Sequence, residues 1–585
     1  MEIKRRAEYD YQTDNIIEFI LRSRGVKKED VKHFLFPDDS LEPDWRLLDN
    51  INEGVELLKK HVDEESDIRV IYDPDLDGYS SGSIMYQFLT KDLGVESVSS
   101  YIPAVKIHGI PLEDTLEHAP DLLIVPDASS SEYSKHKALR EAGIDVLVID
   151  HHLVDNNKQS EDAIVINNQL SHRFKWKELT GAPMVYLFAK AYVETYDLDV
   201  DYNKYLDLSA IGMIADRADL RDLGAFYYAQ KGLKKIHNPL IQHIIEKSNN
   251  VSDSLTPKDV SFTISPLINA MSRYAKAEDI EMVVDALSGK EYEVYNSRLK
   301  DDFHVVQESY RKMSNARNNQ NKKVKEALEI LEERIEEKES ADNQVLLVNS
   351  TGVIDNSGLN GLTSIKLAEK FQRPTLVMQY KESTGELTGS GRNFGSSPLE
   401  SFKDELEKSG LFNFVAGHDN AFGFSIDLDN AMEMVDILND QLSHIEYDNL
   451  THYVDLEYNG RPDAEDIIEI AKHNHIWANG LEEPRVYVRD IRMKKSDIKF
   501  IGARETTWKL DTLGSTDGIM FNLSEEQKLK LTNHDSENLL VSIVGTCGIN
   551  TFRGQKRPQI LIDDFEVKED TNNPWSAFEV DSLPF

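Results

Sequence analysis

The sequence predicts an α/β protein with a doubly wound parallel-sheet domain, a long connecting helix, a second, smaller α/β domain and a C-terminal β-barrel. Three observations predict this order. Apolar strand-like runs alternate with helical patterns from residue 67 to about 240, and a polar stretch without glycine or proline covers 291–340. From about residue 483, short β-rich segments alternate with Gly, Asp and Asn. The 585 residues, 40% of them hydrophobic, supply apolar material for about three to five domains.

The first sheet is predicted from three apolar runs, at 68–72, 122–125 and 146–149. A strand buried on both faces is apolar at nearly every position, and such strands are typical of parallel sheets covered by helices. Helical patterns lie between the runs, as crossover connections between parallel strands require. A doubly wound domain over 67–290 therefore follows.

The remaining segments are assigned from their composition and rhythm. Residues 1–66 show a helical apolar rhythm, and 344–447 open with an apolar run before becoming rich in glycine, which indicates a second α/β domain. The stretch 291–343 predicts one or two connecting helices; a coiled coil is the alternative, but apolar heptads are not sustained. The predicted domains are 1–66, 67–290, 291–343, 344–447, 448–570 for the barrel and 571–585 for a flexible acidic tail.

Composition narrows the class of protein. No apolar run reaches the ~18–20 residues of a membrane-spanning helix, and no apolar segment follows the basic residues near the amino terminus. The single cysteine, Cys547, excludes a disulfide scaffold and a cysteine-based zinc site. We therefore expect a cytoplasmic protein with no membrane contact. The net charge of −38 favours solubility, but it leaves room for local basic grooves and does not identify the partner.

Acidic and histidine side chains follow each of the three predicted strands. In an open parallel sheet, ligands bind beyond the carboxyl ends of the strands. A turn suggested by Pro74 and Gly78 can aim neighbouring acids at one centre, and a further acid ends an apolar helical stretch at 209–215. The residues are Asp73, Asp75 and Asp77 after the first run, Asp127 after the second, Asp150, His151 and His152 after the third, and Asp216.

So many carboxylates cannot share a small site at neutral pH unless cations offset their repulsion. Carboxylate and imidazole ligands without a thiolate suit Mn²⁺ or Mg²⁺, and less selectively Zn²⁺. Two such ions would hold a phosphodiester and activate a water between them. Each piece alone has an ordinary interpretation: a solvated turn, a calcium loop, surface histidines or a helix cap. The calcium loop of an EF-hand would need a downstream Glu that is missing here. The four clusters in order on a βα scaffold favour the metal site.

The same order of motifs resembles the DHH phosphoesterases and, among them, the RecJ-type single-strand-specific exonucleases. The resemblance covers nearly the whole chain, including an OB-fold at 476–567. The matching segments are LRSRGV at 21–26, FLFP at 34–37, LTGAPMVY at 179–186, IGMIADRADL at 211–220, ISPLINAMSR at 264–273, GSGR at 389–392 and AGHDNAFGFSI at 416–426.

The resemblance implies roles for individual residues. Asp127 would bridge two metal ions, Mn²⁺ or Mg²⁺, in one active site. His152 would contact the scissile phosphate or help protonate the leaving oxygen, and Asp150 would orient the two histidines. The guanidinium of Arg273 would bind a phosphate, supported by Asn269. The implied metal ligands are Asp75, Asp77, Asp127, His151 and Asp216, with Asp73 as a further ligand or a support for one; Ser390, Arg392 and His418 would line the opposite lip of the substrate groove.

Several positions depart from the family pattern. Ile71 stands where relatives often carry a histidine, and Ala128 and Ser129 replace a usual Cys-Gly pair. The segment 103–109 lacks an expected arginine, and Ala416 and Phe422 replace a glycine and an alanine. No implied metal ligand is lost. The departures indicate a divergent member and are compatible with an origin in a virus or mobile element.

A nucleic-acid surface is predicted in the barrel. Residues 485–568 hold 14 Lys or Arg against 12 acids, near neutrality in an acidic chain. Binding of a single strand needs cations for phosphates and aromatic faces for bases. The main candidates are Arg489, Trp508, Arg553 and Lys556. The final residues, 581–585, are acidic and close in Pro-Phe, which resembles the tip of bacterial single-strand-binding proteins and suggests docking to such a protein or to another repair or replication protein.

We therefore predict a metal-dependent exonuclease that acts on single-stranded DNA by two-metal-ion catalysis in DNA recombination, repair or replication; the RecJ resemblance implies 5′-to-3′ polarity. One alternative is a nanoRNase or cyclic-dinucleotide phosphodiesterase, which shares the two-domain core but needs no long groove. The other is a non-catalytic replisome component of the same fold, which the intact ligand set disfavours.

Overall fold

The computed structural model describes residues 1–8, 15–103, 108–154, 158–248, 255–395, 397–447, 451–552 and 555–570. The chain forms two compact units. One contains Asp38–Asp448, and the other combines Met1–Pro37 with Asn449–Phe585. The predicted tail at 571–585, with the proposed docking sequence at its end, lies outside the described residues and stays a prediction.

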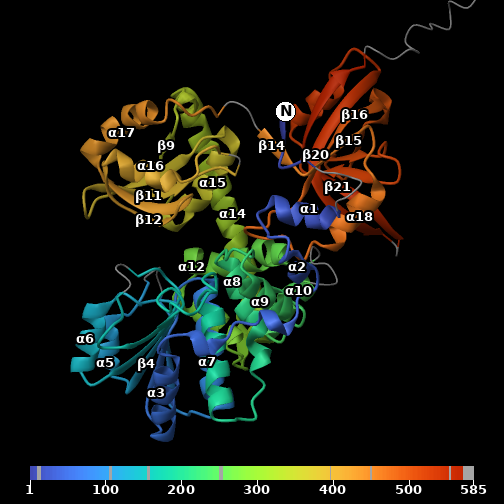
Figure 1. Ribbon diagram of the computed structural model, residues 1–585. Helices are drawn as coiled ribbons and strands as arrows, with labels where there is room; N and C mark the ends of the chain where they lie inside the picture. Colours follow the sequence, from blue (N-terminus) through green and yellow to red (C-terminus); the bar gives the residue numbers. More distant parts are fainter. Residues whose placement is uncertain are drawn as a thin grey trace, which may run out of the picture. The chain divides into compact units, whose positions relative to one another are not determined.

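The larger unit begins with a five-stranded parallel sheet in the order β3-β2-β4-β5-β6. Figure 1 shows α5 and α6 on one face of this sheet and α3 and α7 on the other. This confirms the doubly wound domain. The strands are β2 (Ile68–Ile71), β3 (Val98–Tyr101), β4 (Leu122–Pro126), β5 (Asp145–Asp150) and β6 (Ile164–Asn167); the helices are α3 (Ile51–Asp63), α4 (Leu76–Gln87), α5 (Leu112–His118), α6 (Tyr133–Glu141) and α7 (Gly181–Thr195).

The strand order reverses between β2 and β4. From β2 the chain crosses to β3 on one side, and it then returns to place β4 on the other side of β2. At such a switch point the connections leave in opposite directions, so the strand ends are open to a ligand. Helix α4 follows β2 directly and is buried on nearly every side, because it packs against α7 and α8 as well as the sheet.

A helical layer and a long helix complete this half of the unit. Helices α8 (Leu206–Ala215), α9 (Leu223–Leu233), α10 (Pro239–Lys247), α11 (Pro257–Asp259), α12 (Ser265–Tyr274) and α13 (Ala277–Leu287) precede α14 (Val305–Glu337). Helix α14 confirms the predicted connecting helix, and it contacts α10, α12 and α13 on one side of its path and α15 (Asn360–Phe371) further on.

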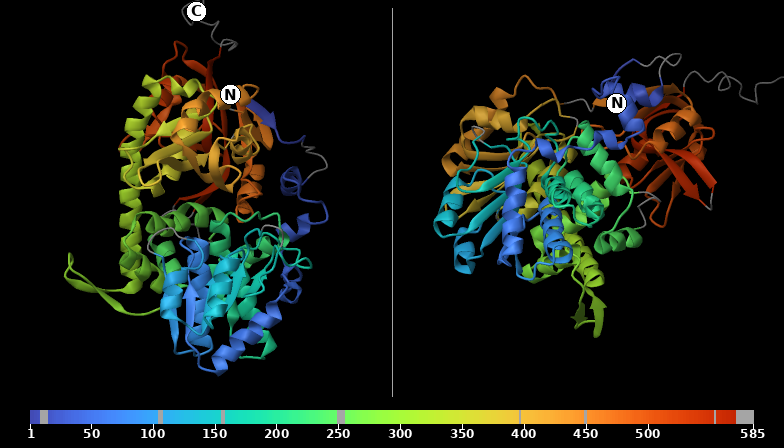
Figure 2. Two further views of the ribbon diagram at one scale, coloured as in Figure 1. Left: turned by 90° about the vertical axis from the view of Figure 1, so that its left-hand side faces the viewer. Right: turned by 60° about the horizontal axis from the view of Figure 1, so that its bottom comes forward.

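The start of the connecting segment differs from the prediction. A hairpin of β7 (Glu293–Asn296) and β8 (Asp301–His304) precedes α14 and projects from the body in Figure 2. The prediction of helix over these residues was wrong, because it relied on the lack of glycine and proline. Here Asn296 makes the turn: its side-chain oxygen accepts hydrogen bonds from the backbone N–H groups of Arg298 and Leu299.

The second α/β domain is a mixed sheet in the order β12-β13-β11-β10-β9, in which only the β9–β10 pair is parallel. Its buried core includes Leu376, Phe402, Phe424 and Leu438. The elements are β9 (Leu346–Asn349), β10 (Thr375–Lys381), β11 (Glu386–Arg392), β12 (Phe412–His418), β13 (Ala421–Asp427), α15, α16 (Phe402–Ser409) and α17 (Leu428–Gln441).

The smaller unit holds a seven-stranded sheet in the order β15-β16-β20-β21-β19-β18-β17. Two long strands, β20 (Asn538–Phe552) and β21 (Gln555–Glu569), form its central hairpin. The other strands of this sheet are β15 (Leu456–Asn459), β16 (Arg485–Lys494), β17 (Lys499–Ile501), β18 (Thr507–Leu510) and β19 (Asp517–Met520). The unit also contains β14 (Thr451–Val454), outside this sheet, and the helices α18 (Ala464–Lys472) and α19 (Glu525–Thr532).

The amino-terminal segment belongs to this smaller unit, a pairing that local sequence cannot reveal. Strand β1 (Glu2–Arg5) pairs in parallel with β14, although the predicted lead-in was helical throughout. Helices α1 (Ile16–Ser23) and α2 (Val31–Leu35) follow. Just after α1, Arg24 forms a bidentate ion pair with Asp455, in which Nη1 lies 2.7 Å from Oδ1 and Nη2 lies 3.0 Å from Oδ2. Both side chains are 1% exposed.

We expect Arg24→Met to destabilise the smaller unit by about 3–5 kcal/mol, because it leaves the Asp455 carboxylate buried without its charge partner. Hydrogen–deuterium exchange of the full chain should show faster exchange of 16–24 and 451–459. The matched control is Arg22→Met, whose ion pair with Glu18 is exposed and spans 3.9 Å; it should change stability by less than about 1 kcal/mol. Equal exchange in the two variants would contradict this account of the pair.

Candidate metal centre and active site

The predicted strand-end residues meet at the switch point of the parallel sheet. Asp73 follows β2, Asp127 follows β4, and Asp150 ends β5 directly before His151 and His152. Asp127 has a backbone φ of +63°, a left-handed conformation that turns the chain sharply out of the strand. Backbone strain of this kind often accompanies functional sites. Here it brings a carboxylate back over the sheet edge.

Asp77 is anchored at the start of two helices. It lies in the first turn of α4, which Asp75 caps by accepting a hydrogen bond from the N–H of Gly78 at 3.1 Å. The Asp77 carboxylate also accepts from the backbone N–H groups of Gly181 (2.7 Å) and Ala182 (3.1 Å), at the amino terminus of α7. Burial, and then the charge of Asp75, nevertheless raises the pKa of Asp77 to about 6. The two N–H groups hold the carboxylate in place, but they do not offset its burial and the negative charge of Asp75.

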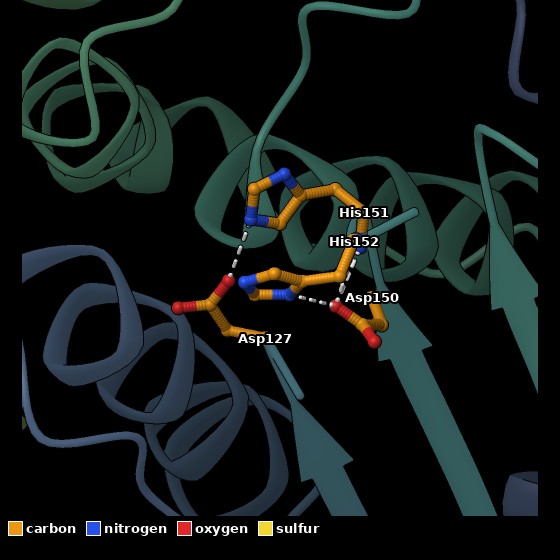
Figure 3. Close-up of side chains that lie close together, drawn as sticks. All are labelled: Asp127, Asp150, His151 and His152. Carbon is orange, nitrogen blue, oxygen red and sulfur yellow. Dashed lines mark hydrogen bonds and ion pairs between the residues drawn. The ribbon is translucent and has the colours of Figure 1, made fainter. Parts of the chain in front are cut away.

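Asp127, His151 and Asp216 form the centre of the cluster. The Nε2 atom of His151 lies 3.1 Å from Asp127 Oδ1 and 3.7 Å from Asp216 Oδ2. Figure 3 shows the His151 ring facing Asp127. Asp127 Oδ1 is buried and makes no hydrogen bond among the described residues. A nitrogen and a carboxylate oxygen that face each other in this way are arranged as two ligands of one cation.

The pKa shifts of Asp127, His151 and Asp216 indicate a site that favours a bound cation. Burial and the charges of Asp77 and other acids raise the pKa of Asp127 well above its usual value, and burial followed by Asp77 and Asp75 raises that of Asp216 to about 8. Burial and the neighbouring His152 lower the pKa of His151 to about 4, so this imidazole is neutral near pH 7. A neutral imidazole and clustered carboxylates are the forms that bind divalent cations.

Three overlapping groups of side chains have ligand atoms within 4.8 Å of one another. Asp127 and His151 each belong to two of these groups, so neighbouring ligand sets share them. The oxygen-rich donor set with an imidazole fits Mn²⁺ or Mg²⁺. The groups are Asp77, His151 and Asp216; Asp73, Asp75 and Asp127; and Asp127, Asp150, His151 and His152.

Asp150 holds the two histidines in place. Its fully buried carboxylate accepts from His152 Nδ1 at 2.8 Å, from the backbone N–H groups of both histidines and from that of Ser130 (Figure 3). Burial acts to raise the pKa of Asp150, but these bonds and charges hold it below its usual value. Burial likewise acts to lower the pKa of His152, yet Asp150 raises it to about 9. His152, 61% exposed, is thus a cation beside the cluster.

Two glycines permit this close packing. A Cβ at Gly181 would lie 2.4 Å from Asp127 Oδ1, and one at Gly212 would lie 2.4 Å from Asp77 Oδ1. Contacts this short are not tolerated, so neither position accepts a larger residue without moving a carboxylate. The glycines of the segments 179–186 and 211–220 therefore make room for the Asp127 and Asp77 carboxylates.

Basic and polar groups from the second α/β domain face the same region. Burial, and then the charges of Arg273 and Arg217, lowers the pKa of Arg392 to about 10, which places three arginines in one electrostatic neighbourhood. The charge of His418 acts on His151, so His418 lies near the cluster. Arg273 is held through its carbonyl, which accepts from Asn356 Nδ2 at 2.7 Å. Ser390 lies two residues before Arg392 on β11.

Comparisons with known proteins match this architecture. The family model "DHH family, N-terminal domain" matches residues 67–213, and "RecJ OB domain" matches 454–564. The SPbeta prophage-derived protein YorK of Bacillus subtilis strain 168, named a single-strand DNA-specific exonuclease, is 33% identical over 97% of this chain and 98% of its own length. The chain belongs to the DHH family, as a RecJ-like member.

Further relatives agree with this assignment. The single-stranded-DNA-specific exonuclease RecJ of Bacillus subtilis is 25% identical over 99% of this RecJ-like chain and 70% of its own length. The crystal structure of RecJ from Thermus thermophilus in complex with Mn²⁺ matches with a TM-score of 0.71 at 18% identity, over 97% of this chain and 79% of that one. This likeness confirms the fold, including the OB domain. In the described residues, no helix is both long and apolar enough to cross a membrane.

The predicted nucleic-acid residues of the OB domain have mixed outcomes. Trp508 is fully buried and packs edge-on against Phe565 with ring centroids 5.2 Å apart, so the prediction that it stacks on a base was wrong. Arg489 is half-exposed and paired with Glu457 at 3.1 Å, while Lys556 is exposed. Arg553 lies outside the described residues. The roles of the remaining cations stay predictions.

Three further residues lie on segments next to the carboxylate and histidine cluster. Asn269 donates to Ser265 Oγ at 3.0 Å and leaves its own side-chain oxygen buried without a partner among the described residues. Arg217, which follows Asp216 with φ +64°, was not predicted, although its place beside an acidic ligand candidate was a usable signal. His108 was not predicted as a site residue either; it contacts Asp73 at 2.9 Å from a different loop.

We expect Gly181→Ala to weaken Mn²⁺ binding by about 10-fold or more, because the added methyl group displaces the Asp127 carboxylate. Isothermal titration of the full chain with Mn²⁺ measures this. Gly548→Ala is the control: its Cβ would meet nothing closer than Gln559 O at 3.9 Å, so affinity should stay unchanged. Wild-type affinity in Gly181→Ala would show that Asp127 does not contribute to metal binding.

Proposed function

We propose that the protein is a metal-dependent exonuclease that hydrolyses single-stranded DNA in the 5′-to-3′ direction, with a role in DNA recombination, repair or replication. The observation that carries the proposal is the convergence of Asp127, His151 and Asp216, whose ligand atoms face one another without a hydrogen bond at Asp127 Oδ1 among the described residues. The names of the relatives support the substrate. The polarity and pathway rest on the family resemblance alone.

In this proposal, the residues of the cluster have separate roles in metal binding and in phosphate binding. Asp77, Asp127, His151 and Asp216 would hold two divalent ions, Mn²⁺ or Mg²⁺, with Asp73 and Asp75 beside them. When bound, the ions supply Lewis-acid activation of the phosphodiester and of the attacking water. His152, kept cationic by Asp150, is placed to donate a hydrogen bond to a phosphate oxygen or to the leaving oxygen. Arg273 and Arg392 add positive charge for the flanking phosphates.

The two alternatives fit less well. A nanoRNase or cyclic-dinucleotide phosphodiesterase would act on a short substrate, whereas this chain carries an OB domain at 454–564. A non-catalytic replisome component would have no need for a complete ligand set, and all six predicted carboxylate and imidazole ligands lie in the cluster. An exonuclease therefore accounts for more of the molecule than either alternative.

Asp127→Asn should reduce hydrolysis of single-stranded DNA by more than about 100-fold, exceeding the usual effect of losing an outer partner of a metal site. Asparagine tolerates the left-handed backbone at this position, so the fold should survive. Asp162→Asn, an exposed pair with Arg140 at 3.4 Å, is the control and should act like the wild type. Near wild-type activity in Asp127→Asn would reject the metal assignment.

Digestion of 5′-labelled and 3′-labelled single strands tests the direction. With Mn²⁺ or Mg²⁺ present, a 5′-to-3′ enzyme releases the 5′ label at once as a short product and shortens the 3′-labelled strand stepwise, and a chelator stops both. A dinucleotide assayed in parallel should be the poorer substrate. The reverse labelling pattern would overturn the polarity, and faster hydrolysis of the dinucleotide would favour the phosphodiesterase alternative.

A further inference from the structure

His108 lies against the metal centre although it belongs to none of the ligand motifs. Its Nδ1 atom is 2.9 Å from one carboxylate oxygen of Asp73 and 3.0 Å from the other. The side chain of Asp73 is only 4% exposed, whereas that of His108 is 55% exposed. A carboxylate that binds a cation is ionised and can only accept hydrogen bonds, so in that state the Nδ1–H group of His108 donates the hydrogen bond to Asp73.

The loop that carries His108 is fastened to the end of strand β4. Glu132 accepts hydrogen bonds from the backbone N–H of Ile110 at 2.8 Å and from Ser129 Oγ at 2.9 Å. Lys135 adds a hydrogen bond to the carbonyl of Ile110 at 2.9 Å. Since Ser129 follows Asp127 by two residues, Glu132 ties the His108 loop to the strand end that supplies the central carboxylate.

Gly109 makes this attachment possible. Its φ is +84°, and a Cβ at this position would lie 2.7 Å from the Glu132 carboxylate. Only glycine satisfies both conditions without strain. The imidazole of His108 therefore reaches Asp73 from a position next to Gly109 and Ile110, which Glu132 and Lys135 hold.

We propose that His108 is a positioning residue of the metal centre, which orients the Asp73 carboxylate so that its free lone pairs face Asp75 and Asp127. This rests on the proposed function, because it requires that these carboxylates bind a divalent ion. Asp73, Asp75 and Asp127 already have oxygens within 4.8 Å of one another. Hydrogen-bonded partners of ligating carboxylates typically contribute about 10–100-fold to metal affinity or activity.

The test is Mn²⁺ titration by calorimetry of the full chain, combined with steady-state hydrolysis of single-stranded DNA. His108→Ala should weaken Mn²⁺ affinity by about 10–100-fold. At a fixed Mn²⁺ concentration below saturation it should lower kcat and leave the KM for DNA unchanged. His108→Asn should restore most of the affinity, because its side-chain N–H₂ can donate from nearly the position of Nδ1. Melting temperatures without metal should match the wild type.

His118→Ala is the matched control. His118 ends α5 and pairs at 3.4 Å with Asp67, which lies just before β2, at the end of the strand opposite to the metal centre. The loss of His118 should therefore leave Mn²⁺ affinity unchanged. Wild-type Mn²⁺ affinity in His108→Ala would overturn the proposal. So would a higher KM for DNA at unchanged affinity, which indicates substrate contact, or failure of His108→Asn to restore affinity, which indicates a need for the ring itself.

The outcomes also separate this inference from the proposed function. If the wild-type chain neither binds Mn²⁺ nor hydrolyses single-stranded DNA, the proposed function fails. If the wild type does both and His108→Ala behaves identically, only the positioning role fails. Should His108→Ala not fold, His108→Asn measured against the wild type and His118→Ala decides: near wild-type affinity supports a donor at this position, and lost affinity overturns it.

Discussion

Repulsion between buried carboxylates is the constraint on which the rest of this structure depends. Asp77, Asp127 and Asp216 are gathered where burial raises the pKa of each, and the neighbouring acids raise it further. A protein keeps such an arrangement when a ligand of opposite charge offsets it. The surrounding elements hold the acids in this costly position: two helix amino termini support Asp77, a left-handed turn carries Asp127, and glycines admit their carboxylates.

The same constraint explains why the pKa values of His151 and His152 are shifted in opposite directions. His151 sits among the acids but is desolvated, and its pKa falls so that its nitrogen remains an electron-pair donor. His152, its neighbour in the chain, is exposed and bonded to the buried Asp150, and its pKa rises. Two adjacent residues of one type thus take opposite protonation states, as a ligand and a cation facing the substrate would require. The difference has two causes: burial and then the charge of His152 lower the pKa of His151, whereas the hydrogen bond from the His152 ring to Asp150 raises that of His152.

The sequence predicted the sheet, and the meeting of the strand-end acids and histidines, because both depend on local signals; the role of these residues as metal ligands stays a prediction. Buried parallel strands are apolar throughout, and strand ends in a switch-point fold converge without further information, so Asp127 and His151 could be placed together. The features that it missed depend on distant partners. Strand β1 pairs with β14, more than 440 residues away, and the loop of His108 reaches Asp73 from a separate strand end. Trp508 was misread because an aromatic among cations is equally compatible with a barrel core.

The two regions that we expect to bind DNA differ in how their arginines are paired. In the OB domain, three arginines are paired with acids: Arg489 with Glu457, Arg492 with Asp570 at 3.3 Å and Arg557 with Asp517 at 3.5 Å. A phosphate that binds there must displace a carboxylate, so attraction to any polyanion is weakened in a chain of net charge −38. Near the metal centre, by contrast, Arg392 donates to the carbonyls of Gly391 and Phe422 and keeps its charge uncompensated by those contacts. Arg392 is therefore more available to a phosphate than the three paired arginines of the OB domain are.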